Sequence, residues 1–112
     1  MPLSECLRVD EPAFVGGIAA MSFALKHLTG SRNGHVDSYE RASVLIGRGR
    51  HNDVALDKFA DPTVSATHAE IRLEQDRFVL YDMGSLNGTF LNGHAVRRAE
   101  LTIGDEIGLG RK

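Results

Sequence analysis

The sequence predicts an all-β fold, a β-sandwich of short antiparallel strands. Two observations support this prediction. Short segments that alternate between apolar and polar residues recur along the chain, and turn signals separate them about every 8–12 residues. No convincing long helix competes with them. The length of 112 residues fits one domain, and 42% hydrophobic residues can form a modest core.

The first half of this strand pattern begins after residue 20. Residues 23–27 alternate between apolar and other side chains, which is typical of a strand. A turn is expected at 30–34, where an Asn-Gly pair tolerates positive φ. The β-branched and apolar run at 43–46 predicts a strand, and a brief strand is expected at 54–56.

The second half shows the clearer pattern. Residues 69–73 and 78–82 alternate on either side of a two-residue turn, so they predict an antiparallel hairpin. An Asn-Gly turn separates two shorter strands expected at 89–91 and 95–96. A last strand is expected around 106–109, after a Gly-Asp turn.

The first twenty residues show neither the strand period nor the helix period. We expect residues 1–20 to form an N-terminal extension, either poorly ordered or laid along a sheet edge. The domain itself is then expected at residues 21–112. A short helix in the extension is not excluded by the pattern.

The composition argues against several classes of function. The net charge is −2, from 13 basic and 15 acidic residues, so the chain lacks the broad basic surface of a nucleic-acid or anionic-membrane binder. One cysteine, Cys6, cannot form an internal disulfide, which favours a reducing compartment and hence the cytoplasm. The apolar stretch 13–25 is too short to span a bilayer. The five histidines show no metal-ligand spacing, so we expect neither a metal nor a cofactor.

Three polar segments marked by glycine fall where expected strands meet turns. They are residues 47–48, 65–69 and 84–89. Together they offer a guanidinium, hydroxyls, a carboxamide and backbone N–H groups, which are donors for an anion. No complete catalytic apparatus accompanies them, so the sequence predicts a protein that binds a charged group and is not an enzyme.

Ser65 and His68 could act as a nucleophile and a base. However, Ser65 does not lie in a Gly-x-Ser-x-Gly elbow, and no orienting acid or oxyanion hole can be assigned. A Ser/His hydrolase is therefore a remote alternative. We prefer a bracing role for His68, because a neutral imidazole can donate one hydrogen bond and accept another.

Arg48 and Asn87 are the other candidates for ligand contacts. Arg48 follows an expected strand, and its planar fork suits bidentate contact with phosphate oxygens. For any single arginine, a solvated surface position is the commoner case. Asn87 lies in an ordinary Asn-Gly turn, yet its carboxamide can pair with both the N–H and the C=O of an extended peptide.

Taken together, four segments resemble the forkhead-associated (FHA) domain family. They are LIGRGRHNDVAL, VSATHAEIRL, RFVLYDMGSLNGTFLNG and LTIGDEIGLG, in matching order and spacing from about residue 43 to residue 110. The resemblance implies an eleven-stranded β-sandwich. It also implies binding of a phosphothreonine-containing protein or peptide in Ser/Thr kinase signalling.

The resemblance further implies a role for each matching residue. Arg48 would contact the phosphate through its guanidinium, and Ser65 would contact it through its hydroxyl. Asn87 would hold the main chain of the peptide. The other matching positions would either offer backbone N–H groups to the phosphate (Ala66 and Leu86) or shape the loops (Gly47, His68, Gly88 and Thr89).

The chain departs from the family at three places. The family often has arginine, asparagine or lysine at Ala66 and serine or threonine at Leu86, so we expect weaker phosphate binding here. The family also supplies an apolar strand after the position of Gly110, and its absence would leave a sheet edge open. The extension, most apolar at 13–20, or another subunit would then cover that edge.

These departures support a second class of function as an alternative. The chain would then be an FHA-type scaffold that binds partners without phosphate, or an oligomerisation module that pairs through an open sheet edge. The sequence does not decide whether the chain is a fragment of a longer protein.

Overall fold

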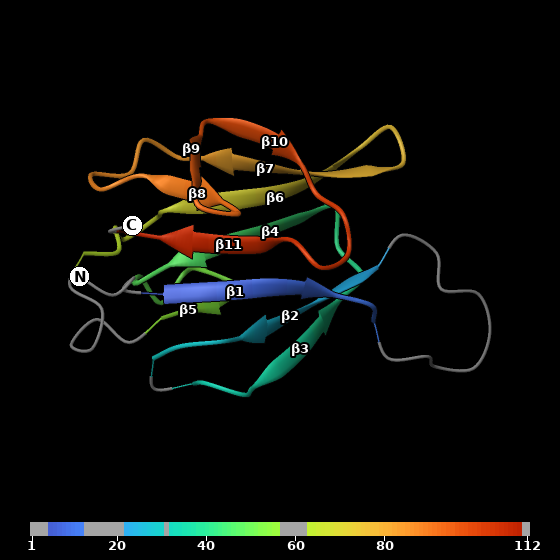
Figure 1. Ribbon diagram of the computed structural model, residues 1–112, viewed down its shortest axis with the longest axis horizontal. Helices are drawn as coiled ribbons and strands as arrows, with labels where there is room; N and C mark the ends of the chain where they lie inside the picture. Colours follow the sequence, from blue (N-terminus) through green and yellow to red (C-terminus); the bar gives the residue numbers. More distant parts are fainter. Residues whose placement is uncertain (1–4, 13–21, 31, 57–62, 111–112) are drawn as a thin grey trace.

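The computed structural model describes residues 5–12, 22–30, 32–56 and 63–110. These residues form eleven strands in two facing sheets, and none of them is helical (Figure 1). In spatial order the six-stranded sheet contains β3 (Val36–Tyr39), β2 (Phe23–His27), β1 (Glu5–Asp10), β11 (Glu106–Leu109), β8 (Thr89–Leu91) and β9 (His94–Val96). The five-stranded sheet contains β10 (Arg98–Glu100), β7 (Arg77–Asp82), β6 (Ala69–Glu74), β4 (Ser43–Gly47) and β5 (Val54–Ala55).

The sheets are almost entirely antiparallel, which confirms the expected β-sandwich. Only β4 and β5 pair in parallel. The β6–β7 hairpin turns through Gln75 and Asp76, both of which adopt positive φ, as a two-residue type I′ turn requires. The strands expected at 23–27, 54–56 and 106–109 are present within a residue of the expected bounds.

The hydrophobic core lies between the two sheets, and both contribute aliphatic side chains with at most 1% exposure. A fully buried side chain of this kind stabilises the fold by about 1.5–3 kcal/mol relative to an exposed one. Aromatic contact joins the sheets as well, since the ring centroids of Phe23 and Phe78 lie 4.6 Å apart. The largest aliphatic members are Leu7, Leu25, Ile107 and Leu109 from one sheet and Ile46, Ile71 and Leu80 from the other.

The N-terminal residues correct one expectation. Residues 5–10 form β1, which lies between β11 and β2 and pairs Leu7 with both Ile107 and His27 (Figure 1). The expectation of a poorly ordered segment therefore does not hold for residues 5–10, whereas the alternative of a segment laid along a sheet edge does. The strand period is hidden because Glu5, Cys6 and Leu7 are buried in succession.

β1 also covers the edge that was expected to be open. β11 pairs with β8 on one side and with β1 on the other. In the described part of the chain, residues 5–8 thus pair with β11 on the side where an open edge was expected. The stretch 13–20, which the sequence suggested as the cover, lies outside the described residues.

Two further strands were not predicted. β3 and β10 both lie at a sheet edge, and most of their side chains are exposed or half-buried. An edge strand buries few side chains, so its apolar alternation is weak. β10 in particular consists of Arg98, Ala99 and Glu100.

The arrangement of the five-stranded sheet brings three loops together. Ile46 pairs with Ala69, and Ala69 pairs with Asp82, so β4 and β7 end where β6 begins. The 48–53 loop, the described 63–68 segment and the 83–88 loop therefore meet at one end of the sandwich.

Candidate anion-binding site

The 48–53 loop and the 63–68 segment are joined through their backbones. The Arg48 N–H donates to the Ser65 carbonyl at 3.1 Å, and the Gly49 N–H donates to the Ala66 carbonyl at 3.0 Å. Gly47 permits this approach, because a Cβ there would lie 2.4 Å from the Ala66 oxygen. Glycine at residue 47 is thus a steric requirement of the loop arrangement.

Asn52 braces the same two segments through its side chain. It is 7% exposed, and its Nδ2 donates to the carbonyls of Gly49 and Ala66 at 2.7 Å each. Asn52 is not among the residues singled out from the sequence. Its role lies in a contact with a segment 14 residues away, which local turn chemistry does not signal.

His68 connects the 63–68 segment to the 83–88 loop. It is fully buried, its Nδ1 accepts from the Ser65 N–H at 3.0 Å, and its Nε2 lies 2.7 Å from the Gly88 carbonyl. Because Nδ1 accepts and a carbonyl cannot donate, the ring is neutral with its proton on Nε2. Burial lowers the pKa of His68 and so keeps the ring neutral. The hydrogen bond to Gly88 and the charge of Asp82 act to raise this pKa, but burial outweighs them.

The same contacts count against a nucleophile–base pair. Both nitrogens of His68 are engaged with backbone groups, and the bond from Ser65 comes from its N–H and not from its hydroxyl. The bracing role preferred from the sequence agrees with this geometry. Within the described residues, no group of three or more histidine, cysteine or acidic side chains is arranged to hold a metal ion.

Asp82 fixes the 83–88 loop. Its carboxylate accepts from the Ser85 hydroxyl, from the Ser85 N–H at 3.3 Å and from the Thr89 hydroxyl at 2.7 Å. Burial works to raise the pKa of Asp82, but these hydrogen bonds outweigh it, and the pKa lies below its usual value. Gly88 completes the turn with a φ of 94°, where a side chain would be strained.

Ser65 and Asn87, whose side chains are expected to bond the ligand, lie close to these bracing contacts. The Ser65 hydroxyl oxygen accepts from the Leu86 N–H at 3.1 Å, and Asn87 Nδ2 donates to the Thr63 carbonyl at 2.9 Å. Asn87 is exposed, and so is Leu86, at 88%. The Leu86 N–H, expected to be offered to phosphate, thus lies beside the Ser65 hydroxyl.

Positive charge at this end of the sandwich has no carboxylate partner among the described residues. Arg48, Arg50 and Arg97 form no ion pair with a described residue, whereas six other described arginines do (Arg8, Arg32, Arg41, Arg72, Arg77 and Arg98). Arg48 is half-buried, and its Nε donates to the Val64 carbonyl. The carbonyl of Arg97 accepts from the Asp82 N–H at 2.9 Å, which places its backbone beside the third loop.

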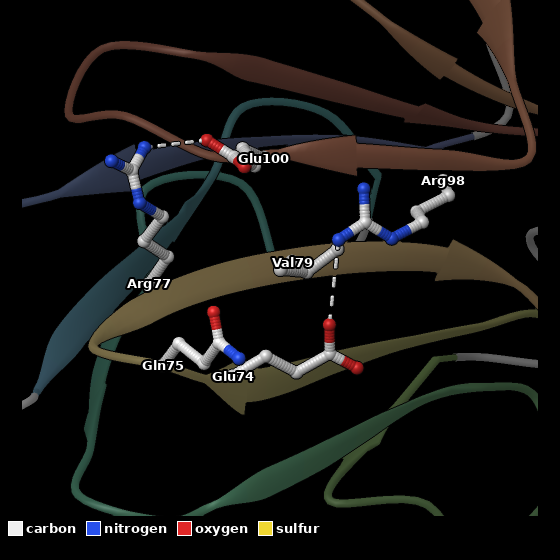
Figure 2. A pocket seen from close by; sticks show the side chains of 6 residues that line it. All are labelled: Glu74, Gln75, Arg77, Val79, Arg98 and Glu100. Carbon is white, nitrogen blue, oxygen red and sulfur yellow. Dashed lines mark hydrogen bonds and ion pairs between the residues drawn. The ribbon is translucent and has the colours of Figure 1, made fainter.

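A cavity of about 670 Å³ lies at the other end of the sheet, and there the arginine side chains are paired with carboxylates. Figure 2 shows it beside the β6–β7 turn, with the buried Val79 and two ion pairs, Arg77–Glu100 at 2.7 Å and Arg98–Glu74 at 3.5 Å. Charges that are paired with one another leave little attraction for an anion. The candidate site is therefore at the loop end and not in this cavity.

A family model for the FHA domain matches residues 44–110. The chain belongs to the FHA domain family. The match begins in β4 and ends just after β11, so it spans every loop of the candidate site. Within the described part of the chain, no helix has the length and hydropathy that a membrane span requires.

Two curated relatives of this FHA domain are regulators by name. The glycogen accumulation regulator GarA of Mycobacterium tuberculosis is 44% identical over 72 residues, which cover 64% of this chain and 43% of GarA. The oxoglutarate dehydrogenase inhibitor of Corynebacterium jeikeium is 36% identical over 100 residues, which cover 89% of this chain and 67% of the inhibitor. The chain thus spans less than half the length of GarA.

Two solved structures are similar to this FHA domain. The FHA domain of an Arabidopsis thaliana protein has a TM-score of 0.75 at 30% identity and covers 90% of this chain and 87% of that one. Mycobacterium tuberculosis EmbR, solved in complex with a low-affinity phosphopeptide, has a TM-score of 0.59 at 27% identity. The latter match covers 70% of this chain and 22% of EmbR.

Proposed function

We propose that this FHA domain is a binding module, and not an enzyme, that recognises phosphothreonine in a partner protein of Ser/Thr kinase signalling. Arg48 contacts the phosphate through its guanidinium, and Ser65 donates its hydroxyl proton to a phosphate oxygen. The Ala66 N–H adds a backbone donor. Asn87 holds the main chain of the peptide, and Gly47, His68, Gly88 and Thr89 keep the loops in place.

Arg48, which has no carboxylate partner among the described residues, carries this proposal. Phosphothreonine has a charge of about −1.5 to −2 and three acceptor oxygens, and each hydrogen bond to a charged group contributes about 1.5–3 kcal/mol. Unmodified threonine offers only a hydroxyl, so it leaves the Arg48 charge uncompensated. Within the described residues, the Ser65 hydroxyl accepts one bond and donates none, so its proton is available.

The test is a titration of a phosphothreonine peptide pool against its unphosphorylated twin, with the wild-type domain and with Arg48→Ala. We expect binding of the phosphorylated pool only, and a loss of at least tenfold in affinity for Arg48→Ala, because one charged contact is removed. Arg77→Ala, at an exposed arginine beside the β6–β7 turn at the other end of the sheet, is the matched control. Equal binding of both pools, or normal binding by Arg48→Ala, contradicts the assignment.

Exposed Leu86 favours a second candidate, a scaffold that binds without phosphate. An apolar side chain at 88% exposure can contact a partner through its surface alone. The same titration separates the two functions, since a scaffold of this kind binds both peptide pools equally.

We further propose that the protein is located in the cytoplasm, where the free thiol of Cys6 stays reduced.

A further inference from the structure

The proposed phosphate site lacks one side chain that the family resemblance leads us to expect. Ala66 follows Ser65 directly and is exposed, but its methyl group offers neither charge nor a hydrogen bond. The residue types expected there all carry a side-chain donor. A replacement would have to reach the same place from another loop.

His51 reaches the 63–68 segment from the 48–53 loop. Its Nε2 lies 2.5 Å from the Thr67 hydroxyl oxygen, and its ring packs against Gly49, where a Cβ would lie 2.4 Å from Cε1. Gly49 is itself bonded to the Ala66 carbonyl. The imidazole is therefore held beside Ala66, and it remains exposed to solvent.

The surroundings of His51 favour an anionic ligand. Arg48 and Arg50 lie on the same loop, and within the described residues neither they nor His51 bond a carboxylate. Asp53, the acid of this loop, is already bonded to Arg41 and to the Leu45 N–H. The titratable group on the facing segment is the buried, neutral His68.

We propose that His51 supplies the cationic contact that Ala66 cannot make, by donating from its ring to the phosphate of a bound phosphothreonine peptide. The inference rests on the function proposed above. The Thr67 hydroxyl holds Nε2, so Nδ1 is the ring nitrogen that remains to donate a hydrogen bond to the phosphate.

The experiment titrates the phosphothreonine peptide pool and its twin into wild type, His51→Gln and His51→Lys at pH 7. Glutamine keeps a hydrogen bond to Thr67 without charge, and lysine keeps the charge without the ring. We expect His51→Gln to weaken phosphopeptide binding about tenfold and His51→Lys to stay within about threefold of wild type. Ala66→Arg added to His51→Gln should restore the affinity.

Two controls make the result specific. His94→Gln changes an exposed histidine on β9 and should leave binding unchanged, and thermal unfolding should show that every variant is folded. A second readout is proton uptake on binding, measured from the binding enthalpy in buffers of different ionisation enthalpy, which His51→Gln should reduce.

The outcomes separate this inference from the proposed function. A wild type that prefers the phosphorylated pool, with His51→Gln within twofold of it, overturns the role of His51 alone. A lysine variant as weak as the glutamine variant also overturns it, because charge would then not be the cause. A wild type that binds both pools equally overturns the phosphothreonine function and this inference together.

Discussion

At the residue scale, the candidate site is held by a few buried polar groups that link loops far apart in sequence. His68 uses both ring nitrogens for two loops, and Asn52 uses one amide nitrogen for two carbonyls. Motif spacing was sufficient to select Arg48, Ser65 and Asn87 as candidates. Asn52 was not selected, since it acts through a contact across loops, and Asp82 was not selected, since it was expected only as a strand residue.

Replacement of His68 by alanine should destabilise the domain strongly. The change removes a buried ring and leaves the Ser65 N–H and the Gly88 carbonyl without a partner, so we expect a loss of about 2–4 kcal/mol in the free energy of unfolding. Urea denaturation measures this quantity. The exposed His94→Ala should change it by less than about 0.5 kcal/mol. A similar small effect for His68→Ala would mean that the ring does not brace the loops.

At the element scale, β1 is the main difference between expectation and structure. Alternation of apolar and polar residues along the sequence identified β2, β6 and β7. β1 shows only a short alternation, of Leu7 and Val9 with Arg8 and Asp10, and the charged Glu5 is buried beside Cys6 and Leu7. Residues 5–8 cover the side of β11 that faces away from β8.

Leu7→Ala tests whether β1 belongs to the core. Leu7 is fully buried, so we expect a loss of about 2–5 kcal/mol in the free energy of unfolding. Arg8→Ala is the matched control in the same strand, and it should destabilise the domain far less than Leu7→Ala because its bond to Asp10 is partly exposed. If Leu7→Ala unfolds at the same urea concentration as wild type, residues 5–10 are not part of the folded sheet.

At the scale of the whole molecule, two buried histidines set a dependence of stability on pH. Burial, with Arg32 and His35 nearby, lowers the pKa of His27 to about 4, and burial lowers that of His68 as well. His27 is thus neutral at pH 7, and its contact with Glu5 at 4.0 Å is not an ion pair there. The unfolded chain binds protons at these sites at a higher pH than the folded chain.

Stability should therefore fall as pH decreases from about 6.5 towards 4. The unfolded state takes up more protons in this window, and each histidine contributes a slope of up to about 1.4 kcal/mol per pH unit. Urea denaturation at several pH values measures the slope, and His27→Gln should make it shallower. The lowered pKa of Asp82 makes stability fall only around and below its ordinary value of 3.8, so it adds little to the slope between pH 6.5 and 4.5. A flat profile between pH 6.5 and 4.5 would contradict the burial of neutral histidines.

The central claim is that the three loops at one end of the sandwich recognise phosphothreonine. Amide chemical shifts, followed while a phosphothreonine peptide is added, test it most directly. We predict that the largest changes fall on Arg48, Ser65, Ala66 and Asn87, and that the unphosphorylated twin leaves them unchanged. Equal changes with both peptides, or changes centred on the cavity beside the β6–β7 turn, would contradict the claim.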